Sequence, residues 1–353
     1  MAKRPTSNIK RLQALAAVAD VVDTPEAILL ETLIRGHAFI LGDTEDDQVA
    51  LIRERMSELE GTLAGRLSEL MERDGSSRSV KTLNNRIGQV RAIRSRGLEK
   101  IADDIEGAAA WSAAASSASI AESVGAVAME AEFLHGFKVL SPRQLQQVAK
   151  RDFLGATVRK WVQARDIVGE LAVERELRAS FFAGDSIPQA VARVRQILKN
   201  DRTEAVTIAR TAISGAANEA AVETYRDNAD ILSGYIQVET LDSRICEECM
   251  ALDGKRYGLK DPSPCPVHPN CRGYLAPDVK GFPRADVPTA REWFDRQSRE
   301  THERVLGKGR AALVFGDSAV SLSDVVTKDG RVRNLGDLER LNATRQRRGT
   351  KAA

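Results

Sequence analysis

The sequence predicts a mainly α-helical protein: an elongated helical body with a helical hairpin, one small β-rich module and a helical C-terminal extension. Three observations support this prediction. Apolar residues make up 42% of the 353 residues but aromatic residues only 5%, which fits Ala- and Leu-rich helices better than a β-sandwich. Long stretches repeat apolar residues at helical spacing. The chain changes to strand-like patterns in one region, and that region contains all four cysteines.

The composition is that of an ordinary globular protein. Charged residues account for 29% of the chain and the formal net charge is +2, so the overall charge indicates neither a nucleic acid nor a membrane as partner. No uncharged run reaches the roughly 18 apolar residues that a membrane-spanning helix needs. Basic residues precede an apolar run over residues 12–22, but Asp20 and Asp23 interrupt the pattern of a signal peptide. We therefore expect an amphipathic helix there, in a soluble protein made in a cytoplasm.

The patterns divide the chain into five predicted parts. They are an N-terminal helical segment (1–45), a heptad-patterned helical hairpin (46–106), a helical body (107–232), a small β-rich module (233–280) and a helical C-terminal extension with a basic tail (281–353).

The hairpin is predicted from two apolar stripes that a polar, Gly-containing break at residues 73–79 separates. Steps of three and four residues define each stripe, as in one face of a helix, and Arg66 lies within the first. The second stripe shows a phase slip between Val90 and Leu98. The first stripe comprises Val49, Ile52, Met56, Leu59, Leu63 and Leu70, and the second Val80, Leu83, Ile87, Val90, Leu98, Ile101 and Ile105.

Three further helical stretches are predicted in the body. Residues 107–133 are rich in Ala and Ser, so we expect a closely packed helix. Ser141-Pro142 is a start signal for a helical block that runs to Phe181-Phe182. Ser186 is a suitable N-cap for the next helix, which we expect to end at Asn200-Asp201 before another helix over residues 203–228.

The β-rich module begins after Gly234. Residues 235–240 alternate with period two and are rich in β-formers, which predicts a strand. Asp253-Gly254 is a turn signal that leads to a second short extended piece at residues 255–257. Residues 272–276 form a third, which we expect to stop at Pro277.

The cysteines of this module have the spacing of a metal site. Cys246 and Cys249 form a C-x2-C unit, and His268 and Cys271 form an H-x2-C unit. Two such pairs on short strands supply the four N/S ligands of a closed, structural Zn²⁺ site, so we expect a zinc-ribbon-like module. Cys265 is the remaining cysteine and could replace His268 in an all-cysteine site.

Two other states of the cysteines remain open. They could be reduced and buried without a metal, or they could form two disulfides. A large helical chain does not need disulfides, and synthesis in a cytoplasm disfavours them.

The same residues also allow a zinc-ribbon nuclease or toxin that acts on nucleic acid. That alternative needs a general base, and His37, His135 and His302 each stand alone in helical contexts. We therefore predict no catalytic residues.

The C-terminal extension ends in basic residues that could contact DNA. Arg345, Arg347, Arg348 and Lys351 follow the last acidic residue, Glu339. Phosphate contacts by such a tail would depend on salt and not on base sequence. A solvated tail without a ligand is the alternative.

Several motifs follow one another in a fixed order: Ile208-Ala209-Arg210-Thr211, Asn218-Glu219-Ala220, the segment from Leu241 to Cys249, Leu252-Asp253-Gly254 and His268-Pro269-Asn270-Cys271-Arg272. Together they resemble the phage Mu protein F-like family, the minor head or head morphogenesis proteins of tailed phages. The resemblance is clear over residues 180–280, and residues 293–336 are similar to the C-terminal extension of many members. Two departures are Ile245, where the family often has Thr, and Gly273, where it often has Cys and thus a further possible ligand.

The resemblance implies a non-enzymatic virion component. Such proteins join the assembling head in few copies, associate with the portal protein, and influence DNA packaging or exit. The implied location is the capsid interior or portal vertex, with the host cytoplasm during assembly. Coat or scaffolding protein and packaged DNA are further partners that it allows.

Overall fold

The computed structural model describes residues 25–75, 79–130, 137–242, 244–281, 289–316, 318–327 and 332–349. The helix expected over residues 12–22 lies outside these ranges, as do His135 and Lys351. Among the described residues, no helix has the length and apolar character that crossing a membrane requires.

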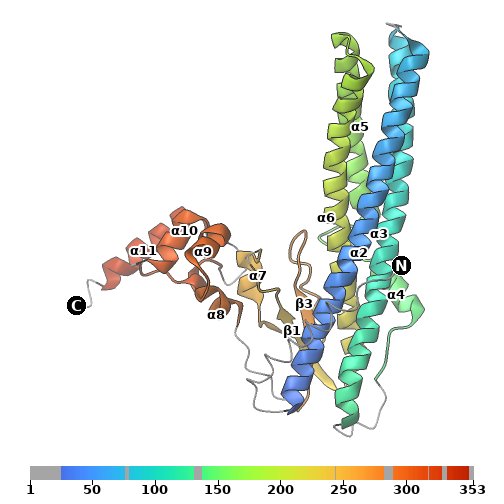
Figure 1. The fold of residues 1–353 in the computed structure, drawn as a ribbon. Coiled ribbons are helices and arrows are strands. Elements are labelled where there is room, and N and C mark those ends of the chain that lie inside the picture. Colours follow the sequence, from blue (N-terminus) through green and yellow to red (C-terminus); the bar gives the residue numbers. More distant parts are fainter. Residues whose placement is uncertain are drawn as a thin grey trace.

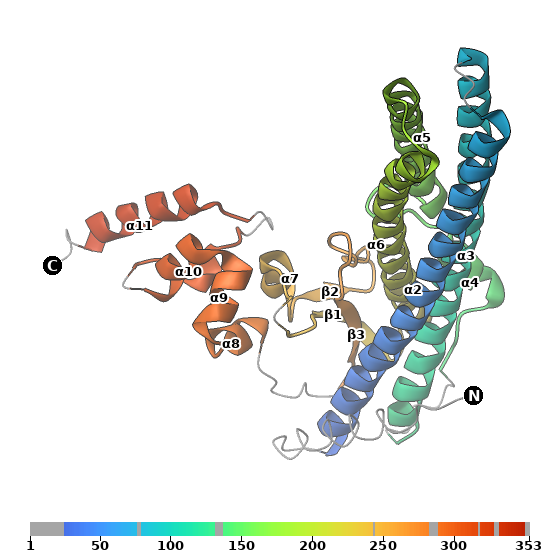
Figure 2. The ribbon, with the colours of Figure 1, turned by 45° about the horizontal axis from the view of Figure 1, so that its top comes forward.

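The described fold is mainly helical with one small sheet. Four long helices run side by side, α2 (Pro25–Asp74), α3 (Val80–Glu130), α5 (Val158–Ala183) and α6 (Ile187–Asp227), and the short helix α4 (Pro142–Ala149) packs on α3 and α6. The sheet lies beside one end of α6, and the C-terminal helices lie beyond it, away from the long helices (Figures 1 and 2). This arrangement confirms the mainly α-helical prediction.

Helices α2 and α3 form the predicted hairpin. Every residue of the first predicted stripe is buried, and so is every residue of the second except Val80, which is 55% exposed. The hairpin extends further in both directions than the heptad pattern indicated, because α2 begins at Pro25 and α3 continues through the Ala-rich segment to Glu130. The division of the chain into five domains remains a prediction.

Small residues allow α3 and α6 to approach closely, as expected for the Ala-rich segment. Ala109 and Ala113 of α3 and Ala209 of α6 are at most 1% exposed and belong to one core. The Ser116 hydroxyl donates a hydrogen bond to the Ala217 carbonyl of α6 at 2.9 Å. A side-chain hydroxyl that reaches a neighbouring helix's backbone is possible only at short helix separation.

The phase slip predicted in the second stripe of α3 occurs where a buried arginine takes the place of an apolar residue. Arg94 continues the stripe between Val90 and Leu98 and is fully buried. Its Nε donates to Asp201 Oδ2 of α6 at 3.0 Å, and Nη1 donates to Asp166 Oδ1 of α5 at 2.5 Å. A Cβ on Gly169 would lie 1.8 Å from Arg94 Nη2, so a glycine at that position makes room for the guanidinium.

The prediction that a helix ends at Asn200-Asp201 is wrong. Helix α6 continues through this point for 41 residues, because the Asp201 side chain binds Arg94 and leaves the backbone helical. Ser186 is its N-cap as predicted, and the Ser186 N–H donates to Gln189 Oε1 at 2.8 Å.

The block predicted from Ser141 to Phe182 is two helices. A tight turn separates α4 from α5, in which Leu154 and Gly155 have positive φ values of 47° and 87° and Phe153 pairs with Ala156. Thr157 caps α5, and Gly184, with a φ of 71°, ends it in the left-handed conformation.

The sheet consists of three antiparallel strands in the order β2-β1-β3. They are β1 (Leu232–Val238), β2 (Arg256–Gly258) and β3 (Tyr274–Val279). Pro277 lies within β3, opposite Tyr235, and does not end the strand as predicted. The proline is tolerated because β3 is an edge strand of the described sheet, where one side of the backbone needs no partner.

Short helices form the C-terminal extension. Their bounds are α8 (Ala290–Asp295), α9 (Arg299–Leu306), α10 (Lys308–Phe315), the 3-10 helix η1 (Leu322–Asp324) and α11 (Leu335–Gly349), and α7 (Glu247–Leu252) precedes them within the module. Phe294, Leu306 and Leu338 are at most 1% exposed in a separate core.

Loss of the Asp201 carboxylate should destabilise the long helices. We expect Asp201→Ala to lower the free energy of unfolding by about 3–5 kcal/mol, since it leaves the buried Arg94 charge without one of its partners. Urea unfolding followed by far-ultraviolet circular dichroism measures the change. Glu303→Ala is the control. It removes the ion pair between Arg299 and Glu303, in which Arg299 is 87% exposed, so the free energy of unfolding should fall by less than about 1 kcal/mol. Equal costs for the two variants would contradict the assignment.

Candidate metal centre

The predicted ligands lie where three segments of the module meet. Glu239 follows the end of β1, Cys246 and Cys249 lie at the start of α7, and His268 and Cys271 belong to the loop that precedes β3. The first cysteine pair is therefore on a helix and not on strands as predicted. Cys246 is the N-cap of this helix and accepts the Cys249 N–H at 3.4 Å. The three-stranded sheet is confirmed, whereas the zinc-ribbon character remains a proposal.

Three of the four predicted ligands converge on one point. His268 Nε2 lies 3.1 Å from Cys246 Sγ and 3.2 Å from Cys249 Sγ. His268 Nδ1 lies 2.8 Å from the Pro269 carbonyl, which fixes a proton on Nδ1 and leaves Nε2 available to the two sulfurs. A ligating histidine held by its other nitrogen in this way is the usual arrangement at zinc sites. These residues fit a zinc ion.

The ionisation of these groups agrees with that chemistry. A hydrogen bond from the Cys249 thiol lowers the pKa of Cys246 to about 4, and the hydrogen bond with Cys246 raises the pKa of His268 to about 9. Hydrogen bonds to Cys246 and Cys271 raise the pKa of Cys249. A metal that binds these sulfurs and His268 Nε2 would displace any protons they carry.

Cys271 belongs to a second group that shares Cys249. The ligand atoms of Cys249, Cys271 and Glu239 lie within 4.8 Å of one another, as do those of Cys246, Cys249 and His268. Sequence reasoning missed Glu239, because a single glutamate at the end of a strand has no spacing signal. Burial raises the pKa of Glu239 to about 8.

Neighbouring residues hold the Glu239 carboxylate in place. Gln237 Nε2 donates to Glu239 Oε1 at 2.6 Å, and the Tyr257 hydroxyl donates to Gln237 Oε1 at 3.0 Å. A Cβ on Gly273 would lie 2.6 Å from Glu239 Oε1. The carboxylate therefore fills the space that a side chain at position 273 would need, which is one of the two positions where this chain departs from the phage family.

Cys265 lies on the other side of Cys271. It is 5% exposed and packs in the core between the sheet and the long helices, with Tyr225 and Tyr235. A hydrogen bond to Cys271 raises the pKa of the Cys265 thiol. The cysteine forms part of neither group of metal-ligating atoms within the described ranges.

Helix α6 positions the loop that carries His268 and Cys271. The Asn270 N–H donates to Thr211 Oγ1 at 3.1 Å, and Asn218 Nδ2 donates to the Gly273 carbonyl at 3.0 Å. Thr211 and Asn218 are two turns apart on the same face of α6. Both residues belong to the motifs quoted for the phage family, and the contacts give them a structural role at the centre.

An ion pair joins the two segments that carry the cysteines. Arg272 Nη1 and Nη2 donate to the two oxygens of Asp242 at 2.6 and 2.7 Å. This bidentate hydrogen bonding holds the pKa of Asp242 well below its usual range.

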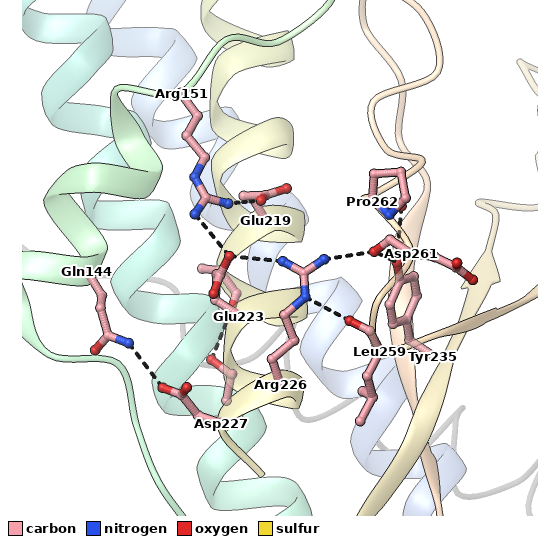
Figure 3. Close-up of polar contacts among 12 residues, drawn as sticks. Gln144, Arg151, Glu219, Glu223, Arg226, Asp227, Tyr235, Leu259, Asp261 and Pro262 are labelled. Carbon is pink, nitrogen blue, oxygen red and sulfur yellow. Dashed lines mark hydrogen bonds and ion pairs between the residues drawn. The ribbon is translucent and has the colours of Figure 1, made fainter. Parts of the chain in front are cut away.

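A network on α6 holds the preceding loop (Figure 3). Arg226 donates to the carbonyls of Leu259 and Asp261 at 2.8 and 2.7 Å, and Arg226 Nη1 donates to Glu223 at 3.0 Å. Arg151 contacts both Glu223 and Glu219 from the loop between α4 and α5. The turn between α4 and α5 is thereby linked through α6 to the loop that leads to Cys265.

The C-terminal extension covers the opposite side of the centre. Cys249 and Cys271 belong to the same core as Phe294 and Leu306. Asp253 connects the parts directly: Oδ1 accepts the Glu239 N–H at 2.9 Å, and Oδ2 accepts the Ala290 N–H at 2.8 Å. The cysteine-containing centre thus lies between the sheet and the C-terminal helices.

The basic tail is only partly described. The sequence suggested that no acidic residue neutralises Arg345, and this is wrong. Arg345 donates to both oxygens of Asp324 at 2.6 and 2.8 Å. This pairing was not visible in sequence, since the partner lies 21 residues earlier in the chain. The side chain of Arg348 is outside the description, as is Lys351.

Comparison with known proteins supports the resemblance drawn from the motifs. Residues 172–276 match the family described as Phage Mu protein F like protein. The matched segment extends from α5 through α6 into β3 and includes every predicted ligand, so the resemblance to the Mu protein F-like family is confirmed there. No curated protein and no solved structure matches the chain significantly.

Cysteine substitutions should separate ligands from packing residues. We expect Cys246→Ser and Cys271→Ser to lose one zinc per chain and to destabilise residues 235–277, since structural zinc contributes about 10–16 kcal/mol of apparent binding free energy in small modules. Native mass spectrometry gives the metal content, and hydrogen exchange locates the destabilised segment. The long helices should keep their protection.

Cys265→Ser is the matched control and should retain zinc. If this variant loses zinc while His268→Ala retains it, Cys265 rather than His268 is the fourth ligand.

Proposed function

We propose that the protein is a minor head protein of a tailed phage. In this proposal it is a non-enzymatic virion component that associates with the portal protein and acts in head assembly, DNA packaging or DNA exit. Coat or scaffolding protein is a further partner. The protein is located in the capsid interior or at the portal vertex, after assembly in the host cytoplasm.

The observation that carries this proposal is the family match over residues 172–276. Its motif residues converge on one centre: Thr211 and Asn218 hold the ligand loop, and Arg272 binds Asp242. The ordered motifs are therefore one structural unit and not separate coincidences of sequence.

The proposed centre stabilises structure. Cys246, Cys249, His268 and Cys271 are the proposed ligands of a zinc ion that fixes the contact between the sheet, α7 and the C-terminal helices. When bound, zinc would replace protons on the thiols and cross-link segments that are otherwise joined by loops. A rigid junction of this kind supports a role in assembly.

The nuclease alternative gains no support within the described part of the chain. His302 is buried and stacks on Phe315 with ring centroids 3.7 Å apart, and its Nε2 lies 2.7 Å from the Phe294 carbonyl. This histidine packs in the C-terminal core, where it has no access to a substrate.

Portal association is tested with the whole chain. We expect the protein to co-purify with the portal ring of its own phage, and mass spectrometry of purified virions should find it in few copies. Cys246→Ser, which disrupts the proposed junction, should reduce incorporation, whereas Cys265→Ser should not. Absence from virions together with absence of portal binding would refute the proposal.

We also propose that the tail makes non-specific contacts with packaged DNA through Arg345, Arg347, Arg348 and Lys351. Removal of residues 345–351 should make DNA affinity less dependent on salt, because fewer phosphates are neutralised. Fluorescence anisotropy at several salt concentrations measures the slope. Arg345→Gln alone should change the slope least, since Asp324 already pairs with Arg345. An unchanged slope after the deletion would exclude the tail from DNA binding.

A further inference from the structure

Glu239 is a buried carboxylate that faces two thiols. It is 5% exposed, and its oxygens belong to the same group of potential ligand atoms as Cys249 Sγ and Cys271 Sγ. Among the described residues, one side-chain nitrogen donates to it, Gln237 Nε2 at 2.6 Å. The Cys249 thiol also forms a hydrogen bond with it. Both donors are neutral, and a cation beside the buried carboxylate would compensate its charge.

The surrounding residues aim the carboxylate at the cysteines. Gln237 is fully buried and is itself held by the Tyr257 hydroxyl, so the amide that contacts Glu239 cannot rotate freely. Asp253 accepts the Glu239 backbone N–H at 2.9 Å and fixes the end of the strand. Gly273 leaves open the space that the carboxylate occupies.

We propose that the Glu239 carboxylate is itself a ligand of the metal held at this centre, beside Cys249 and Cys271. The inference rests on the proposed zinc site and extends its ligand set from sulfur and nitrogen to oxygen, a donor that zinc also accepts. Cys249 is the residue common to both groups of ligand atoms, and in this proposal the ion lies close to its sulfur, on the side of Glu239 and Cys271. The shell then differs from the closed set of three cysteines and one histidine that spacing predicts.

The test uses the full chain loaded with ¹¹³Cd²⁺, whose NMR chemical shift reports the number of sulfur and oxygen ligands. Glu239→Gln should shift the resonance and weaken metal binding at least tenfold. Glu247→Gln is the matched control: this glutamate is adjacent to Cys246 but pairs with Arg310 at 2.5 Å, and its substitution should leave the resonance in place. Circular dichroism verifies that both variants are folded.

A double variant tests the position of the ligand. Glu239→Ala combined with Gly273→Cys removes the carboxylate and places a thiol in the space that it occupied. Metal binding should recover relative to Glu239→Ala alone, with the resonance displaced in the direction expected for one more sulfur. Failure to recover would count against a ligand at that point.

The outcomes separate the two proposals. If the unmodified chain binds no zinc or cadmium, both the proposed metal site and the proposed ligand role of Glu239 are refuted. If the chain binds one ion and Glu239→Gln leaves the resonance unchanged, the site stands and the ligand role of Glu239 is refuted, even where affinity decreases.

Discussion

The continuity of α6 is the constraint on which the rest of the structure depends. Its first half packs in the four-helix core through residues such as Val194 and Leu198, and its second half holds the ligand loop through Thr211 and Asn218. The two halves remain one helix because Asp201, a poor helix former, directs its side chain to the buried Arg94. The same ion pair connects α6 to α3, and Asp166 of α5 also binds Arg94, which connects α5 to α3.

The candidate centre is held from three directions. Helix α6 fixes the loop before β3, the sheet positions Glu239 through Gln237 and Tyr257, and the C-terminal helices enclose Cys249 and Cys271 in an apolar core. These contacts give motif residues other than cysteine and histidine, such as Thr211 and Asn218, a structural role in this chain. They also explain why a metal here would stabilise the junction between parts of the protein, and not just the small sheet.

The proposed function gains from this organisation. A protein that docks on a portal ring benefits from rigid junctions. Several polar networks supply them, including the one in which Arg151, from the loop between α4 and α5, binds Glu223 of α6, which also pairs with Arg226 (Figure 3). Helix α5 leaves Ile167, Val168 and Leu171 more than half exposed, which suits a protein that works in an assembly.

The sequence by itself determined the helical hairpin, the Ser186 N-cap and the cysteine/histidine spacing, because helical periodicity, capping and C-x2-C units are local patterns. Tertiary structure decided what depends on distant partners. Asp201 continues a helix because Arg94 is 107 residues away in sequence and adjacent in space. Pro277 remains in a strand because β3 is at an edge, and Arg345 is paired because Asp324 folds back against it. Glu239 reaches the centre only because the fold brings the end of β1, Gly273 and the cysteines together. No spacing in the sequence indicates that these segments are in contact.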